Sequence, residues 1–445
     1  MIQNLEARFK AAIESGLFDD FGLLYEPTAT LTARLAGRDL AIDGSDRIVS
    51  ELNGWWSGPG RVDRWDASTS DGGLRVMLER SWGNGAADRE GQYHLLHVRR
   101  GRVTEHWVFC VHARYGPAPV IDGPLPSFLL NARERAPLPH AGDSGSYLER
   151  VVLAEGRAAI VKHISPSVDW IMRATHDTGR EAELWEAGHL QELSTIDVPT
   201  FAVEREGHDG WAIAMRDVSE TLVADRSPVR PEENRRFLEA ADALHRQFDG
   251  RALPGLCSLA DRLFMFSPGI ALAEHNRSFL MPKILGCAWE LFPEVVADDD
   301  VASIILGLLG DPAPLINELA CEGATLLHGD YYDSNLGLAD DRIVAFDWAM
   351  ACSGPPEVEF VYFLHNWANT PVECRADLIA DWRAIRGDDF DQRRLQLATL
   401  YQVLLCGWSW SQKVWATNPV VRQRIEADMA WWLAEVRTAL DTWSP

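Results

Sequence analysis

The chain has 445 residues, a length that predicts two to four domains at about 100–200 residues each. Hydrophobic residues make up 47% of it and charged residues 24%, as in folded soluble proteins, so a disordered chain and a small disulfide scaffold are excluded. The formal net charge of −24 disfavours binding to nucleic acid, because phosphate backbones require a basic face. This charge also repels anionic membranes and suits a cationic small molecule, although solubility alone explains it equally well.

The cysteines and the apolar segments indicate where the protein works. The seven cysteines are scattered and form no C-x-x-C pair, which is typical of reduced thiols in a cytoplasm. The first residues resemble an amphipathic helix and lack the apolar core of a signal peptide. No apolar run approaches the roughly 18 residues that a membrane span needs. The sequence therefore predicts a cytoplasmic protein without a membrane partner.

Lysine is rare in this chain, so motifs that need lysine are easily tested. The four lysines are Lys10, Lys162, Lys283 and Lys413, and none of them follows a glycine. Because the P-loop motif places a glycine directly before its lysine, a P-loop nucleotide-binding protein is excluded.

Residues 1–116 form the first predicted domain. A helix is expected at the start and another after Asp43-Gly44-Ser45, where Ser45 or Asp46 caps it. Runs of alternating apolar residues predict a meander of long strands, and the glycine turn Gly101-Arg102 between residues 92–100 and 103–111 indicates a hairpin. This order predicts a curved antiparallel sheet packed on helices.

That order of helices and strands, which ends in V-R-R-G-R-V-T-E-H-W, resembles the nuclear-transport-factor-2-like fold, which includes polyketide-cyclase-like proteins. The resemblance implies a cone with a pocket, for which the polar candidates are His94, His97, His106 and Asp66. Histidines on strand faces are also common as ordinary residues of a sheet. Three uses stay open for this domain: it forms a homodimer through the sheet, binds a small ligand, or is a separate enzyme.

A proline-rich segment, residues 117–139, is expected to be a linker, because proline removes backbone donors and favours extended structure. Its apolar centre, residues 127–130, is expected to pack on a neighbouring domain. The segment divides the charge unevenly: residues 1–139 carry −2 and residues 140–445 carry −22.

Residues 140–217 alternate between strand and helix patterns. Two strands joined at Glu155-Gly156 precede an expected helix over 177–193, and two more strands end near 218. Residues 218–445 are mostly helical, apart from a hairpin-like patch at 325–348. The predicted fold class is therefore α+β, with a cone-shaped domain before a small β-rich lobe and a large helical lobe.

The patch at 325–348 carries the strongest chemical signal in the sequence. His328-Gly329-Asp330 is followed by Asn335, and a short apolar strand then leads to Asp347. Asn335 and Asp347 provide the oxygen ligands that Mg²⁺ prefers, and Asp330 is left to orient an acceptor hydroxyl and take its proton. The pattern therefore predicts phosphoryl transfer.

H-G-D-x-x-x-x-N followed by I-V-A-F-D-W resembles the aminoglycoside phosphotransferase family, which has the bilobal protein-kinase-like fold. His-Gly-Asp stands where protein kinases carry H-R-D, and Asp-Trp stands where they carry D-F-G. These two differences favour a kinase for small molecules. The resemblance implies ATP or GTP and Mg²⁺ as cofactors, and an aminoglycoside-like, sugar, antibiotic or amino-alcohol acceptor.

The resemblance also implies which residues bind the nucleotide. Lys162 on the third strand would hold its phosphates, paired with a helix glutamate that is either Glu181 or Glu183, of which the family pattern R-E-A favours Glu181. Further cofactor-binding positions are Ser144, Gly145 and Ser146 in a loop over the phosphates and the main chain of Ala214, Met215 and Arg216 at the adenine.

Two residues near the catalytic motif are expected to be structural. His328 would brace the loop by hydrogen bonds, and Glu359 occupies the place of an aspartate in the family pattern. Tryptophans and acids after residue 356 could receive a cationic acceptor, although tryptophans at helical spacing usually fill a core. An alternative is a degenerate kinase-like module that binds or regulates without turnover.

Overall fold

The computed structural model describes residues 2–443 apart from 36–37, 56–59, 71–72, 83–88, 111–123, 139–143, 224–228, 275–279, 297–298, 321–323, 340–341, 367–373 and 412–418. The chain divides into two compact units. Unit 1 comprises Met1–Pro117, His275–Leu280 and Gln412–Arg424, and unit 2 comprises Ala118–Glu274, Met281–Ser411 and Ile425–Pro445. Within the described ranges, no helix is both long and apolar enough to cross a membrane.

Unit 1 is built on a six-stranded sheet in the order β2-β1-β6-β5-β4-β3. All neighbours are antiparallel except β1 and β6, which run parallel with Leu31 opposite His106, so the prediction of a fully antiparallel sheet is wrong for this pair. The two strands are joined through a helix and four other strands, and such a long connection does not impose the direction that a hairpin turn imposes. The strands are β1 (Tyr25–Leu35), β2 (Arg38–Asp43), β3 (Gly60–Ser70), β4 (Gly73–Trp82), β5 (Arg89–Arg99) and β6 (Arg102–Cys110).

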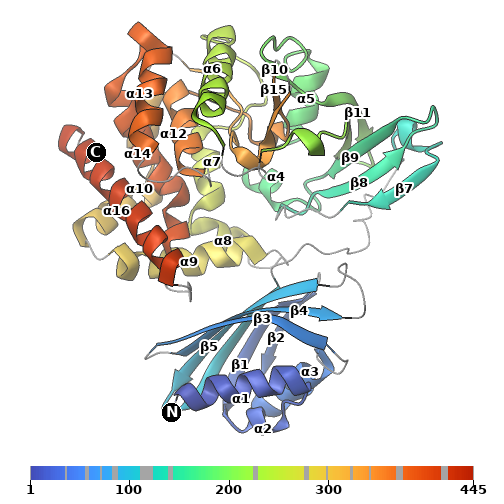
Figure 1. Cartoon of the computed structure of the whole chain (residues 1–445), viewed down its shortest axis with the longest axis vertical. Coiled ribbons are helices and arrows are strands. Elements are labelled where there is room, and N and C mark those ends of the chain that lie inside the picture. Colours follow the sequence, from blue (N-terminus) through green and yellow to red (C-terminus); the bar gives the residue numbers. More distant parts are fainter. Residues whose placement is uncertain are drawn as a thin grey trace. The chain divides into compact units, whose positions relative to one another are not determined.

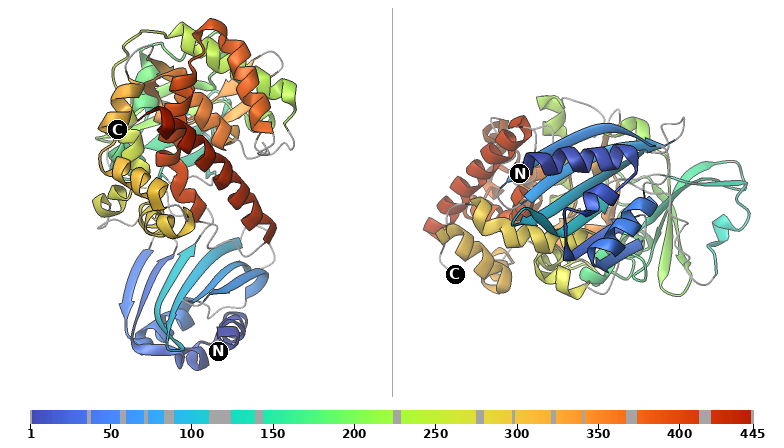
Figure 2. Two further views of the ribbon diagram at one scale, coloured as in Figure 1. Left: turned by 90° about the vertical axis from the view of Figure 1, so that its left-hand side faces the viewer. Right: turned by 90° about the horizontal axis from the view of Figure 1, so that it is seen from below.

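The core of unit 1 lies between one face of this sheet and its helices (Figures 1 and 2). On β4, Leu74, Val76 and Leu78 alternate toward that face, as the two-residue period of a strand requires. Phe9 of α1 is fully buried against them. The helices are α1 (Ile2–Ser15), α2 (Asp19–Gly22) and α3 (Ser45–Trp55), so both predicted helices are confirmed and α2 is additional.

The small lobe of unit 2 contains a five-stranded antiparallel sheet in the order β11-β12-β9-β8-β7. Its edge strand β7 lies within the segment expected to be a linker, and Leu129 of that segment is buried against the sheet, as predicted for its apolar centre. Helix α5 is shorter than expected, because it starts after Gly179 and ends at Glu186. The elements are β7 (Glu134–Pro137), β8 (Tyr147–Val152), β9 (Ala158–Ile164), α4 (Trp170–Ala174), α5 (Arg180–Glu186), β10 (Ile196–Asp197), β11 (Thr200–Glu206) and β12 (Gly210–Met215).

The rest of unit 2 is mainly helical, as predicted (Figure 1). Short strands carry the chemical motif: β14 pairs with β15, β15 pairs in parallel with β10, and β13 pairs with β16. These strands are β13 (Thr325–Leu327), β14 (Leu336–Leu338), β15 (Ile343–Ala345) and β16 (Cys352–Gly354). The helices are α6 (Pro231–Gln247), α7 (Leu259–Phe266), α8 (Gly269–Ala273), α9 (Leu280–Val296), α10 (Asp299–Gly310), α11 (Ala313–Leu319), α12 (Pro356–Asn366), α13 (Arg375–Arg386), α14 (Gln392–Cys406) and α16 (Pro419–Thr442).

Candidate active site

Asp330 lies in the loop between β13 and β14 and accepts hydrogen bonds at both carboxylate oxygens. The Tyr362 hydroxyl of α12 donates to Oδ1 at 2.5 Å, and Asn335 Nδ2 donates to Oδ2 at 2.8 Å. Burial raises the pKa of Asp330 to about 6, against the effect of these two bonds. At neutral pH the side chain is therefore mostly a carboxylate, able to accept a further proton.

The backbone on either side of Asp330 is fixed by buried contacts. Gly329 has φ +80°, and a Cβ there would lie 1.9 Å from the Met350 carbonyl oxygen, so only glycine fits. Glu359 accepts from the amides of His328 at 3.1 Å and Gly329 at 2.7 Å, which confirms its expected structural role. These contacts explain why glycine precedes the aspartate in this chain.

His328 braces the same loop, as expected from the sequence. Its Nε2 donates to the Phe346 carbonyl at 3.1 Å, and its Nδ1 accepts from the Asp330 amide at 3.2 Å. Burial lowers the pKa of His328, so the ring is neutral and both nitrogens are occupied. The ring therefore connects the Asp330 loop to the residue before Asp347.

Asp347 follows β15 and has a left-handed backbone conformation, with φ 65° and ψ 62°. Such a conformation is uncommon for a residue other than glycine and often occurs at functional sites. Its Oδ1 accepts from Lys162 Nζ at 2.6 Å, and the same nitrogen donates to Glu181 Oε2 at 3.0 Å. The lysine thus bridges a carboxylate of α5 and the carboxylate after β15.

Charge coupling favours the charged forms of Lys162 and Asp347, whereas burial raises the pKa of Glu181. Burial by itself lowers the pKa of Lys162, but the carboxylates of Asp347 and Glu181 outweigh it and raise the pKa above its ordinary value. Burial likewise favours the neutral form of Asp347, and the Lys162 cation outweighs it, so the pKa of Asp347 is lowered. Glu181 is completely buried, whereas the side chain of Glu183 is 38% exposed and contacts Thr178. The structure therefore pairs Lys162 with Glu181.

The residues expected around a nucleotide lie on the same lobe. In the loop before β8, the hydroxyls of Ser144 and Ser146 lie 2.9 Å apart, and Gly145 has φ +100°. The Ser144 carbonyl accepts from Trp170 N at 2.9 Å, which ties this loop to α4. At the positions expected near the adenine, Ala214 and Met215 belong to β12, which lies between β11 and β9, and the Arg216 amide donates to the Pro199 carbonyl at 3.0 Å.

Of the six described tryptophans after residue 360, four are buried, in line with the expectation that tryptophans at helical spacing fill a core. Trp382, Trp410 and Trp432 are completely or almost completely buried. Glu357 and Glu359 are buried as well, so neither acid faces solvent. Trp367, Glu373 and Trp415 lie outside the described residues.

In unit 1, the histidines on the strands form a buried chain of hydrogen bonds. The Tyr25 hydroxyl lies 2.5 Å from His106 Nδ1, His106 Nε2 lies 3.0 Å from His94 Nδ1, and His94 Nε2 lies 3.1 Å from Gln92 Oε1. Burial lowers the pKa of both histidines, for His106 to about 3. Two neutral rings that each donate once and accept once fit this chain. His97 is exposed, and the side chain of Asp66 lies outside the described part of the chain.

Comparison with known proteins agrees with the geometry of unit 2. The sequence profile of the phosphotransferase enzyme family matches residues 144–397, which is more than half of the chain. The chain belongs to this phosphotransferase family. The enzyme class predicted from the sequence, a phosphotransferase, is therefore confirmed.

Solved structures similar to parts of this phosphotransferase are distant in sequence. An aminoglycoside phosphotransferase from Alicyclobacillus acidocaldarius is 14% identical over 72% of this chain and 96% of its own, with a TM-score of 0.40. The choline kinase LicA from Streptococcus pneumoniae is 14% identical over 68% of this chain and 95% of its own, with a TM-score of 0.40. A nuclear-transport-factor-2-like protein of unknown function from Cytophaga hutchinsonii is 13% identical over 25% of this chain and 89% of its own, with a TM-score of 0.20. No curated protein matches the chain.

Two further residues that contact the Asp330 loop did not emerge from the sequence. Tyr362 donates to Asp330, and the buried Arg262 of α7 donates to the Gly329 carbonyl and lies over the Tyr362 ring at 4.5 Å. Helical spacing offered a signal for Tyr362, because it lies three residues after Glu359 and so on the same face of α12. No comparable sequence signal marks Arg262.

Proposed function

We propose that this phosphotransferase transfers the γ-phosphate of ATP or GTP to a hydroxyl group of a small molecule, with Asp330 orienting and deprotonating that hydroxyl. The observation that carries the proposal is the setting of Asp330. Its carboxylate is ionised at neutral pH, is held at both oxygens, and lies in a loop whose backbone is fixed by Glu359. A carboxylate that is fixed in position and still has free lone pairs can act as the general base for a hydroxyl nucleophile.

Lys162 supports the nucleotide half of the proposal. A buried lysine that remains protonated is a ready cation for phosphate oxygens, and the second carboxylate, Glu181, holds it in place. Ser144, Gly145 and Ser146 are proposed to cover the phosphates. At the nucleobase, the Arg216 amide already binds Pro199, so we propose that the Arg216 carbonyl is used there, with the main chain of Ala214 and Met215 beside it.

The residues expected to hold Mg²⁺ fit that ion. Asn335 turns its Nδ2 toward Asp330, which leaves its carbonyl oxygen as a ligand. Asp347 uses Oδ1 for Lys162, its side chain is 39% exposed, and Oδ2 is left as a second hard oxygen donor. Bound there, the ion would neutralise phosphate charge and orient the phosphates. Asp330 would remain free for the acceptor.

The acceptor is proposed to be a hydroxylated molecule that is cationic, such as an aminoglycoside, an amino sugar or an amino alcohol. The charge of −22 over residues 140–445 supports this, since it attracts cations to the part of the chain that contains Asp330. For unit 1 we propose dimerisation or ligand binding, because its histidines are occupied by one another inside a core.

A nucleotide-consumption screen tests the proposed function. The full-length protein is incubated with ATP or GTP, Mg²⁺ and a panel of hydroxylated acceptors, and products are analysed by mass spectrometry for an added phosphate. Transfer that is lost in Asp330→Asn supports the proposal. Nucleotide binding without transfer to any acceptor would instead favour the binding or regulatory module.

A further inference from the structure

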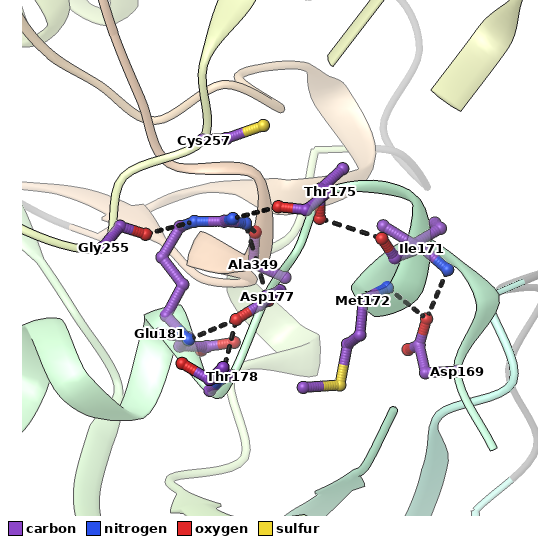
Figure 3. A network of polar contacts seen from close by, with 12 residues as sticks. Asp169, Ile171, Met172, Thr175, Asp177, Thr178, Glu181, Gly255, Cys257 and Ala349 are labelled. Carbon is purple, nitrogen blue, oxygen red and sulfur yellow. Dashed lines mark hydrogen bonds and ion pairs between the residues drawn. The ribbon is translucent and has the colours of Figure 1, made fainter. Parts of the chain in front are cut away.

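Arg180, the first residue of α5, uses all three of its guanidinium nitrogens on backbone carbonyls. Nε donates to Gly255 O at 2.9 Å, Nη2 donates to Thr175 O at 3.0 Å, and Nη1 donates to Ala349 O. The side chain is 3% exposed, and Asp177 supplies a carboxylate 3.5 Å from Nη1. Figure 3 shows Thr175, Gly255 and Ala349 gathered around this network.

The three carbonyls belong to separate parts of unit 2. Thr175 ends α4 in the small lobe, Gly255 lies in the segment before α7, and Ala349 lies two residues after Asp347. The last two segments are also joined to each other, because the Cys257 amide donates to the Ala351 carbonyl at 2.9 Å. One side chain therefore connects the start of α5 to the helical lobe and to the segment that carries Asp347.

The start of α5 is itself held in place. Asp177 Oδ1 accepts from the amides of Gly179 at 2.7 Å and Arg180 at 2.6 Å. Gly179 has φ +120°, and a Cβ there would lie 1.9 Å from Trp211 Nε1, so the chain passes directly against that ring. Because Glu181 is the next residue, the position of Arg180 determines where the Glu181 carboxylate meets Lys162.

We propose that Arg180 is a positioning residue that holds Glu181 and Asp347 in mutual register, so that Lys162 can bridge them. The inference rests on the proposed function, in which those three side chains serve the nucleotide. Helix α5 and the segment after Asp347 then move only together, and the lysine stays oriented before a nucleotide arrives.

The arginine fork is necessary for this role. Three donors in one plane reach three carbonyls from three directions, whereas the single nitrogen of lysine is a compact charge that cannot span them. Arg180→Lys keeps the positive charge but cannot reach all three carbonyls, and Arg180→Gln loses both the charge and the three contacts. Arg386→Lys is a matched control, because Arg386 is also buried and charged but pairs with Asp242 between α13 and α6.

Hydrogen exchange of the full-length protein tests the coupling without relying on activity. In Arg180→Gln we expect the amides of residues 180–187 and of residues 347–352 to exchange at least ten times faster, in parallel, and in Arg180→Lys a smaller parallel rise. Arg386→Lys should leave both segments at the wild-type rate. Faster exchange in only one segment, or in neither, would overturn the proposal.

Steady-state kinetics provides the second readout. With the best acceptor from the screen, Arg180→Lys should lower kcat at least tenfold and raise the half-saturating Mg²⁺ concentration several-fold, with the acceptor KM within twofold of wild type. Loss of thermal stability alone, with kcat and the Mg²⁺ requirement unchanged below the melting temperature, would reduce Arg180 to a structural residue. If the wild-type protein transfers phosphate to no acceptor, the proposed function fails, and hydrogen exchange still decides the role of Arg180.

Discussion

Replacing Asp330 with asparagine removes the proposed base and almost nothing else. Asparagine has the same shape as aspartate, and its Nδ2 can donate to the Tyr362 oxygen while its Oδ1 accepts from Asn335. General-base catalysis contributes about 10²–10⁴-fold. We therefore expect kcat to fall by about that factor, which corresponds to about 3–5 kcal/mol of transition-state stabilisation. Nucleotide affinity should stay within about threefold of wild type.

The stability of the Asp330→Asn variant should move in the opposite direction. Burial raises the pKa of Asp330 from 3.8 to about 6, so the folded protein binds its proton more tightly than the unfolded chain does. At neutral pH the ionised carboxylate therefore destabilises the fold, by about 3 kcal/mol at most. The amide carries no such cost, and we expect the variant to unfold at the wild-type temperature or above it.

The assay is single-turnover and steady-state phosphate transfer, combined with calorimetric titration of nucleotide and thermal unfolding. Glu357→Gln is the matched control, because Glu357 is a completely buried carboxylate whose oxygens have no hydrogen-bond partner among the described residues. It should keep the wild-type kcat. Wild-type turnover in a folded Asp330→Asn variant would refute the assignment of the base, and a large loss in the control would show that kcat responds to any buried carboxylate.

Three other predictions follow from the site and from unit 1. Lys162→Met leaves Glu181 and Asp347 without their cation, so we expect nucleotide binding to be at least tenfold weaker in a titration and the free energy of unfolding in urea to be about 3 kcal/mol lower. Wild-type values of both quantities would contradict the bridging role of Lys162. Gly329→Ala should lower the free energy of unfolding by more than about 2 kcal/mol, because the added Cβ would collide with the Met350 carbonyl. A Cβ at Gly310 meets nothing within 4 Å, so the control Gly310→Ala should be neutral or stabilising, and equal effects of the two variants would refute the steric argument. Because burial keeps His94 and His106 neutral, only the unfolded chain takes up protons there, and unit 1 should lose about 1.4 kcal/mol of stability per pH unit for each ring as the pH falls below 6.5. Protection factors of β5 and β6 from hydrogen exchange at pH 7 and pH 5 check this, and stronger protection at pH 5 would disprove it.

The catalytic motif could be predicted from the sequence because its residues are close together in the chain. Four residues lie between Asp330 and Asn335, and short apolar strands on both sides fix where the loop begins and ends. Lys162 could be predicted because lysine is so rare here. Helix α5 was predicted too long, since its apolar pattern continues past Glu186. The helix ends there because Gly188 has φ +83° and its amide turns back to the Trp185 carbonyl, a local stop signal that the apolar pattern does not include.

Long-range pairing was the part that local patterns could not supply. The parallel contact of β1 with β6 depends on segments far apart in sequence. Strand β7 pairs with the next strand, β8, and was missed because the prolines around it indicated a linker. A strand pattern indicates which residues are extended but not which strand pairs with them, because every residue except proline offers the same backbone hydrogen-bonding groups.

The sequence by itself determined the class of the protein and the side chains suited to phosphoryl transfer, because those depend on residue types at short spacing. The tertiary structure decided which of two glutamates meets Lys162, that most of the described tryptophans after residue 360 are buried, and that Tyr362 and Arg262 support the Asp330 loop. It also brought Arg180 to three carbonyls up to 169 positions away in the chain. Such contacts arise only when separate elements pack, since most polar groups that become buried need a hydrogen-bond partner there.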